Sequence, residues 1–60
     1  MPTAKEYRAR AKECLEMANA AKDRYVRTAL RELTLEFNRE ARQAERRERD
    51  MAAFSNLQTH

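Results

Sequence analysis

The sequence contains no glycine and no tryptophan, and it has one proline, one cysteine and one histidine among its 60 residues. Because Cys14 is the only cysteine, a disulfide within the chain is excluded, and a single unpaired thiol is typical of a reducing, cytoplasmic compartment. His60 has no metal-ligating neighbour in the sequence, so we expect no metal site. A small fold without these two stabilising devices is expected to rely on association.

Long apolar runs are missing as well. The N-terminal Met-Pro-Thr-Ala-Lys-Glu has no apolar stretch of signal-peptide length, and no segment is apolar enough to span a bilayer. We therefore expect a cytoplasmic protein with no membrane partner. Charged residues make up 38% of the chain, with a net charge of +3, and the bias towards Ala, Glu, Arg and Leu is typical of long helices and coiled coils.

Apolar residues recur at spacings of three and four in two separate stripes, which is the pattern of an amphipathic helix. The first stripe is Tyr7, Ala11, Cys14, Ala18 and Ala21, and the second is Val26, Leu30, Leu33, Phe37, Ala41 and Ala44. In one continuous helix the second stripe would lie roughly 120° around from the first, whereas a turn near residues 21–24 lets both face one core. We therefore predict an all-α fold, an antiparallel two-helix hairpin. One long helix in a trimer or tetramer is the alternative.

Capping signals mark the starts of both predicted helices. Thr3 followed by Glu6 forms a capping box, and Asp23 is a good N-cap for the second helix. With no glycine at the turn, Asn19 or Lys22 is expected to take the unusual backbone angles.

The predicted hairpin is a single domain covering residues 1–60. The first helix is expected over about 3–21 and the second over about 24–52, with 53–60 as a frayed tail. The second helix would be the longer one, leaving its part from about Glu40 onward without a partner in the same chain.

Association is expected because a hairpin of this size is marginal alone, burying only about 60% of its unfolded surface. Leu15 and Met17 flank the first stripe on opposite sides, which makes an apolar arc too wide for one partner helix. Both arguments favour a homodimer that forms a four-helix bundle. The predicted self-association core comprises Tyr7, Ala11, Cys14, Leu15, Ala18, Val26, Leu30, Leu33 and Phe37.

An arginine stripe occupies roughly a 120° arc of the second predicted helix. Its members are Arg27, Arg31, Arg39, Arg42, Arg46 and Arg49. One interpretation is a solvated face, or a face that forms ion pairs across subunits. The other is a basic surface for a nucleic-acid backbone, against which the modest net charge argues.

Recognisable catalytic chemistry is absent from the sequence. There is no nucleophile–base pair, no glycine-rich phosphate loop and no metal-ligand spacing, and Cys14 is interpreted as a small buried hydrophobe. We therefore expect no enzyme activity, no cofactor and no small-molecule substrate. The predicted function is that of a small interaction or regulatory protein acting through self-association and binding of a protein partner. The alternatives are a nucleic-acid-binding module and a subunit that folds on a larger protein.

The run Tyr7-Arg-Ala-Arg-Ala-Lys-Glu-Cys, followed by Asp23 and by Val26-Arg-x-x-Leu-x-x-Leu, resembles a group of short alphaproteobacterial proteins. These typically read Tyr-Arg-x-Arg-Ala-x-Glu-Cys, then a short Asp-containing turn, then Val-Arg-x-x-Leu-x-x-Leu. Arg24 stands where members commonly carry a proline, and Phe37 stands near a position that is often tryptophan. The group has no known activity, so the resemblance implies a bacterial, cytosolic hairpin and transfers no functional residues.

Overall fold

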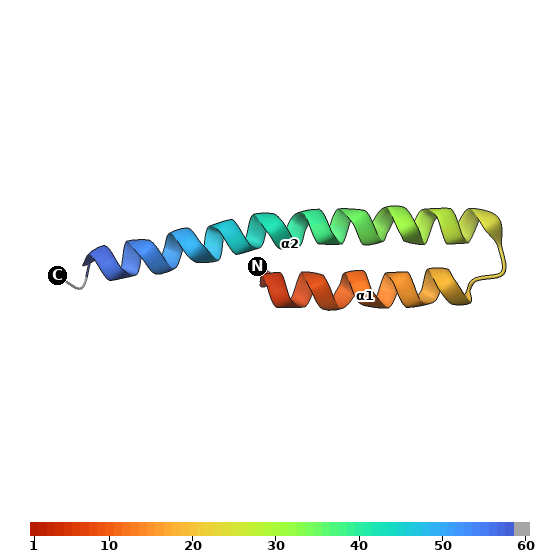
Figure 1. Ribbon diagram of the computed structural model, residues 1–60, viewed down its shortest axis with the longest axis horizontal. Helices are drawn as coiled ribbons and strands as arrows, with labels where there is room; N and C mark the ends of the chain where they lie inside the picture. Colours follow the sequence, from red (N-terminus) through yellow and green to blue (C-terminus); the bar gives the residue numbers. More distant parts are fainter. Residues whose placement is uncertain (59–60) are drawn as a thin grey trace.

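The computed structural model describes residues 1–58 and consists of two antiparallel helices joined by a short turn (Figure 1). Helix α1 runs over Ala4–Ala20 and helix α2 over Arg24–Gln58. The hairpin is a rod of 56 × 14 × 13 Å. The predicted all-α hairpin is thus confirmed, and the alternative of one continuous helix is wrong.

Both predicted N-caps are formed. The Thr3 hydroxyl accepts a hydrogen bond from the Glu6 N–H at 3.2 Å. The Asp23 carboxylate accepts from the N–H groups of Tyr25 at 2.8 Å and Val26 at 3.1 Å. These bonds satisfy N–H groups that have no partner within the helix, so each cap defines where its helix begins.

The cap at Asp23 gives a direct prediction. Asp23→Ala is expected to lower the free energy of unfolding by about 1 kcal/mol, because two N–H groups at the start of α2 lose their acceptor. Asp23→Asn should keep most of that stability, since asparagine is an equally good N-cap. Thermal unfolding followed by circular dichroism measures both, and equal losses for the two variants would contradict the capping role.

The turn between the helices forms without glycine. Ala21 ends α1 with an extended backbone, φ −70° and ψ 134°, and its N–H donates to the carbonyls of Met17 and Ala18. No residue within 1–58 has a positive φ. The prediction that Asn19 or Lys22 takes unusual backbone angles is therefore wrong, because an extended residue lets the chain leave the helix at no steric cost.

The two helices contact each other along a seam with alternating spacings of three and four. The seam comprises Ala4, Tyr7, Ala11, Cys14, Ala18 and Ala21 of α1, and Arg27, Leu30, Thr34, Phe37, Ala41, Ala44 and Glu48 of α2. This spacing averages 3.5 residues, the period of a coiled coil. On α1 the seam contains the whole predicted stripe.

On α2 the seam differs from the predicted stripe at two steps. Arg27 and Thr34 take the places expected for Val26 and Leu33, which are 48% and 42% exposed in the hairpin. Thr34 is only 9% exposed, and its hydroxyl donates to the Leu30 carbonyl at 2.9 Å. The alanines of α1 bring the two helices close together, so the seam admits a small residue with a satisfied hydroxyl more easily than a leucine.

The paired part of α2 extends further than expected. Ala41 and Ala44 are buried, and the Ala4 N–H donates to the Glu48 carboxylate at 2.9 Å. The expectation of an unpartnered segment from about Glu40 onward is therefore wrong, because these alanines let the first turns of α1 lie directly against α2. The overhang begins only after Glu48.

Helix α2 also continues beyond its predicted end at about Ala52 and remains helical to Gln58. The interpretation of 53–58 as a frayed tail is wrong: this segment has no glycine or proline to end the helix, and the chain enters it through the strong helix formers Ala52 and Ala53. The tail prediction for Thr59 and His60 lies outside the described residues.

Candidate interaction surfaces

The hairpin has two broad flanks, one on each side of the seam. An ion pair between Arg8 and Glu45 identifies which side of α1 lies beside which side of α2. Residues seven apart lie on the same side of a coiled-coil helix, so the remaining side chains can be assigned to flanks from their spacing. The two flanks differ sharply in chemistry.

The apolar flank lies on the side away from the Arg8–Glu45 pair. Its members are Cys14 and Met17 of α1 with Val26, Leu30, Leu33 and Phe37 of α2. Cys14, Leu30 and Phe37 are half-buried, whereas Met17, Val26 and Leu33 are exposed. An open groove of about 290 Å³ beside Leu33 and Phe37 has the charged residues Glu36, Arg39 and Glu40 on its wall.

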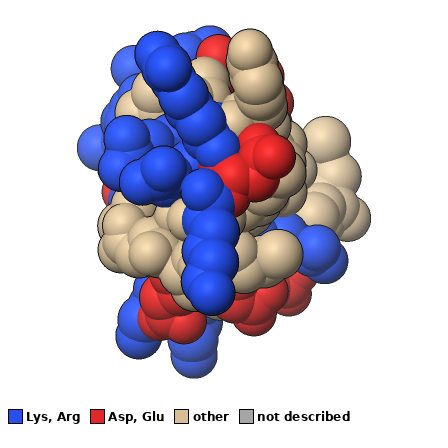
Figure 2. Space-filling view, turned by 90° about the vertical axis from the view of Figure 1, so that its right-hand side faces the viewer, with Lys and Arg blue, Asp and Glu red and all other residues tan. Residues whose placement is uncertain are grey.

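The basic flank lies on the opposite side of the seam. It comprises Arg8 of α1 with Arg24, Arg31, Arg42 and Arg49 of α2. Figure 2, which views the hairpin from the turn, shows Lys and Arg side chains gathered on one side of the upper helix, and mostly uncharged residues on the other side. The hairpin is therefore amphipathic as a whole and not only helix by helix.

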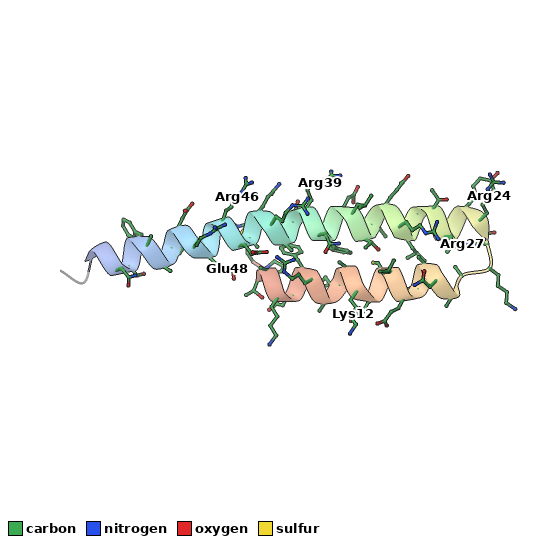
Figure 3. All side chains as sticks on the ribbon, in the orientation of Figure 1. Lys12, Arg24, Arg27, Arg39, Arg46 and Glu48 are labelled. Atoms are coloured by element: carbon green, nitrogen blue, oxygen red, sulfur yellow. The ribbon has the colours of Figure 1, made fainter. Side chains whose placement is uncertain are left out.

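The predicted arginine stripe divides into two parts. Arg27 is half-buried and turns towards the C-terminal end of α1, whereas Arg39 and Arg46 point away from α1 (Figure 3). Arg31, Arg42 and Arg49 are also exposed. Five of the six predicted members thus form one surface, and Arg27 belongs to the seam.

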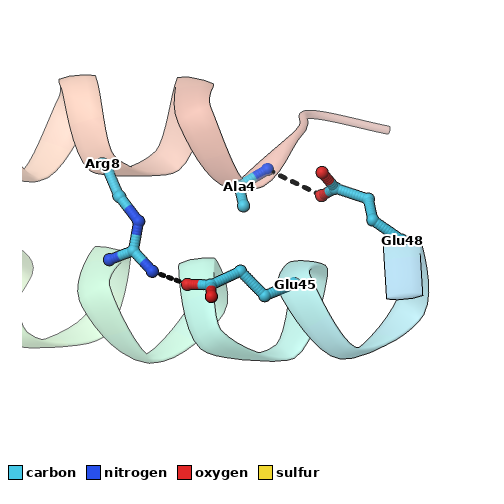
Figure 4. A network of polar contacts seen from close by, with 4 residues as sticks. All are labelled: Ala4, Arg8, Glu45 and Glu48. Carbon is cyan, nitrogen blue, oxygen red and sulfur yellow. Dashed lines mark hydrogen bonds and ion pairs between the residues drawn. The ribbon is translucent and has the colours of Figure 1, made fainter. Parts of the chain in front are cut away.

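Two carboxylates of α2 hold the N-terminal end of α1, as Figure 4 shows. Glu45 pairs with Arg8, and Glu48 accepts the hydrogen bond from the first helical N–H of α1, that of Ala4. A carboxylate beside a helix N-terminus also interacts favourably with the helix dipole. At the other end of α1, whose last turn has no basic residue of its own, Arg27 supplies a positive charge.

Sequence reasoning missed this arrangement because the pattern along one helix does not say which side chain of the other helix lies beside it. The available signal was periodicity: Glu48 lies seven residues after Ala41 and so continues the seam. The two charged seam residues stand at opposite ends of the paired region, with Glu48 at the positive N-terminal end of α1 and Arg27 at its negative C-terminal end. A shift of α1 along α2 would separate these charges from the helix ends that they complement.

This pairing predicts a measurable role for Glu48. Glu48→Ala is expected to lower the free energy of unfolding by about 0.5–1 kcal/mol, since α1 loses the acceptor and the negative charge at its N-terminus. Asp50→Ala removes an equal charge from an exposed site and serves as the control, with little change expected. Chemical unfolding of both variants measures the difference, and equal stabilities would contradict the role.

The residues of the predicted self-association core lie in three environments within the hairpin. Ala11 and Ala18 are buried in the seam. Tyr7, Cys14, Leu30 and Phe37 are half-buried, and the rings of Tyr7 and Phe37 lie 6.4 Å apart between centroids. The other three members, Leu15, Val26 and Leu33, are exposed.

These exposed members do not share one surface. Leu15 lies seven residues after Arg8 and hence on the basic flank, whereas Val26 and Leu33 lie on the apolar flank. A single partner hairpin on one flank therefore leaves Leu15 uncovered, and the apolar flank is the larger candidate surface.

Residues 1–58 contain no group of three or more His, Cys, Asp or Glu side chains placed to hold a metal ion. Neither helix, over its described length, is long and apolar enough to cross a membrane.

Comparison with known proteins assigns no family to the chain. No protein-family model matches it, and comparison with curated proteins and with solved structures gives no match either. The resemblance to short alphaproteobacterial proteins stays a prediction, and the functional argument rests on the surfaces described above.

Proposed function

We propose that this protein is a non-enzymatic interaction protein that self-associates through its apolar flank into a four-helix bundle. The observation that carries the proposal is the exposure of Met17, Val26 and Leu33 on one side of the hairpin. Contiguous exposed apolar surface is typical of an interaction site.

The interior of the single hairpin supports this proposal. Its buried residues are five alanines and Thr34, and no large side chain within the described chain is fully buried. Burial of alanines removes little apolar area from water, so a lone hairpin gains little hydrophobic free energy. Covering the apolar flank would bury the larger side chains that the seam leaves exposed.

The charges on the apolar flank favour a second copy of the chain as its occupant. Arg10 lies seven residues before Met17, and Glu40 lies seven residues after Leu33, so both stand on this flank. Neither forms an ion pair within the described hairpin. A surface that carries both signs can complement a second copy of itself, because a two-fold partner can pair the arginine of one copy with the glutamate of the other.

The test is sedimentation equilibrium over a range of concentrations. One chain has a mass of 7.1 kDa, and we expect the mass of two chains at micromolar concentration, with high salt leaving the assembly intact because its interface is mainly apolar. A helical monomer at every concentration would overturn self-association. In that case the apolar flank would belong to a different protein partner.

A further inference from the structure

The exposed part of the arginine stripe forms a row along α2, unbroken from Arg39 to Arg49, which we call the arginine rail. It comprises Arg31, Arg39, Arg42, Arg46 and Arg49. From Arg39 to Arg49 the spacings are three, four and three, so successive side chains are nearest neighbours on the helix surface. With Arg31 the row is about 27 Å long.

The arginines of the rail have no counter-charge bound to them. The described chain holds one ion pair, between Arg8 and Glu45. This pair directs the Glu45 carboxylate, which lies close to the rail in the sequence, towards α1 and away from the rail arginines. Asp50 lies beside Arg46, and Glu36 lies one turn before Arg39, but neither pairs with the rail. Like charges one turn apart destabilise a helix by a few tenths of a kcal/mol, which a bound anion relieves.

Apart from Arg39, which lines the groove beside Leu33, the rail lies outside the surface proposed for self-association. Arg39 and Arg46 point directly away from α1, and Arg31, Arg42 and Arg49 lie towards the basic flank (Figure 3). A second hairpin on the apolar flank would leave Arg31, Arg42, Arg46 and Arg49 open to solvent. Because all five rail arginines lie on one helix of one chain, anion binding by the rail does not depend on the dimer.

The chemistry of the rail fits a phosphodiester backbone better than a lipid surface. Guanidinium groups bind phosphate oxygens in pairs, and a straight row matches the regular charges of an extended polyanion. A membrane-surface helix needs several large apolar side chains beside its cations, but the rail has a single one next to it, and the apolar flank faces elsewhere. Leu35 is the one large apolar residue next to the rail.

We propose that the arginine rail binds the sugar-phosphate backbone of a nucleic acid without reading its sequence. Phosphate contacts position a protein on nucleic acid but carry no base information. Five contacts predict a slope of log affinity against log salt of about −4.5 for duplex DNA and about −3.5 for single-stranded RNA. Binding to duplex DNA should then weaken on the order of 100-fold between 50 and 150 mM salt.

The experiment uses fluorescence anisotropy with a labelled 30-base-pair DNA duplex and a labelled 30-nucleotide RNA. The rail variant carries Arg39→Gln, Arg42→Gln and Arg46→Gln. The control carries Lys5→Gln, Lys12→Gln and Lys22→Gln, which removes the same charge from exposed sites outside both the rail and the apolar flank. Circular dichroism checks that both variants keep the helicity of the unmodified chain.

We expect the rail variant to bind at least tenfold more weakly at 50 mM salt, with its slope reduced to about −2 on duplex DNA, while the control loses little. Equal losses in the two variants would overturn the proposal, since binding would then follow total charge. No binding of the unmodified chain at 50 mM salt would also overturn it. So would binding to vesicles containing phosphatidylserine in place of either nucleic acid.

Discussion

Replacing Leu33 with aspartate is expected to convert the proposed dimer into monomers, whereas Leu35→Asp should leave it intact. The two leucines are close in the sequence and both are exposed, at 42% and 60%. They differ in direction: Leu33 lies on the apolar flank, whereas Leu35, seven residues before Arg42, lies on the basic flank. A charge buried at the dimer contact would be desolvated without a partner, and two-fold symmetry would place it there twice.

Sedimentation equilibrium of the two variants measures this difference. We expect the dissociation constant of Leu33→Asp to rise at least about 100-fold, which corresponds to roughly 3 kcal/mol. Leu35→Asp should change it less than about threefold. Because both variants add the same charge to the same helix, a loss of the dimer in both would indicate general destabilisation and contradict the apolar flank as the contact.

Replacing Ala11 with leucine is expected to destabilise the hairpin itself. Ala11 is buried near the middle of α1 and faces α2, where the close approach of the helices leaves no room for a branched side chain. Overpacking of this kind typically costs about 1–3 kcal/mol. In a small hairpin with few large buried side chains, such a loss is a large share of the total stability.

Ala9→Leu is the matched control. Ala9 is exposed on α1, and leucine is nearly as good a helix former as alanine, so the intrinsic helix propensity changes little in either variant. Thermal unfolding should show a clear fall in melting temperature for Ala11→Leu alone. If Ala11→Leu were as stable as the unmodified chain, the seam would have to be wider than the alanines indicate.

The local features of the fold were largely predictable from the sequence. Thr3 and Asp23 act as N-caps, as their residue types and positions indicated, because a cap depends on residues within one turn of it. The first stripe of apolar residues was also predicted completely. The unusual backbone angles expected at Asn19 or Lys22 were predicted wrongly, since the extended conformation at Ala21 is available to any residue and leaves no sequence signal.

The interaction surfaces were harder to predict. The sequence placed Leu15 and Leu33 in one self-association core, but they lie on opposite flanks of the hairpin. The arginine stripe was recognised as a row of like residues. Only the position of α1 separates Arg27, which faces the end of that helix, from the five arginines of the rail.

The sequence by itself determined the helices, their caps and the presence of two apolar stripes, since these depend on propensity and on periodicity along one helix. The tertiary structure decided the register between the helices. Small side chains on α1 select which residues of α2 enter the seam, so Thr34 is buried and Leu33 remains exposed. That choice depends on the distance between the two helices, and the periodicity of residues along either helix carries no information about this distance.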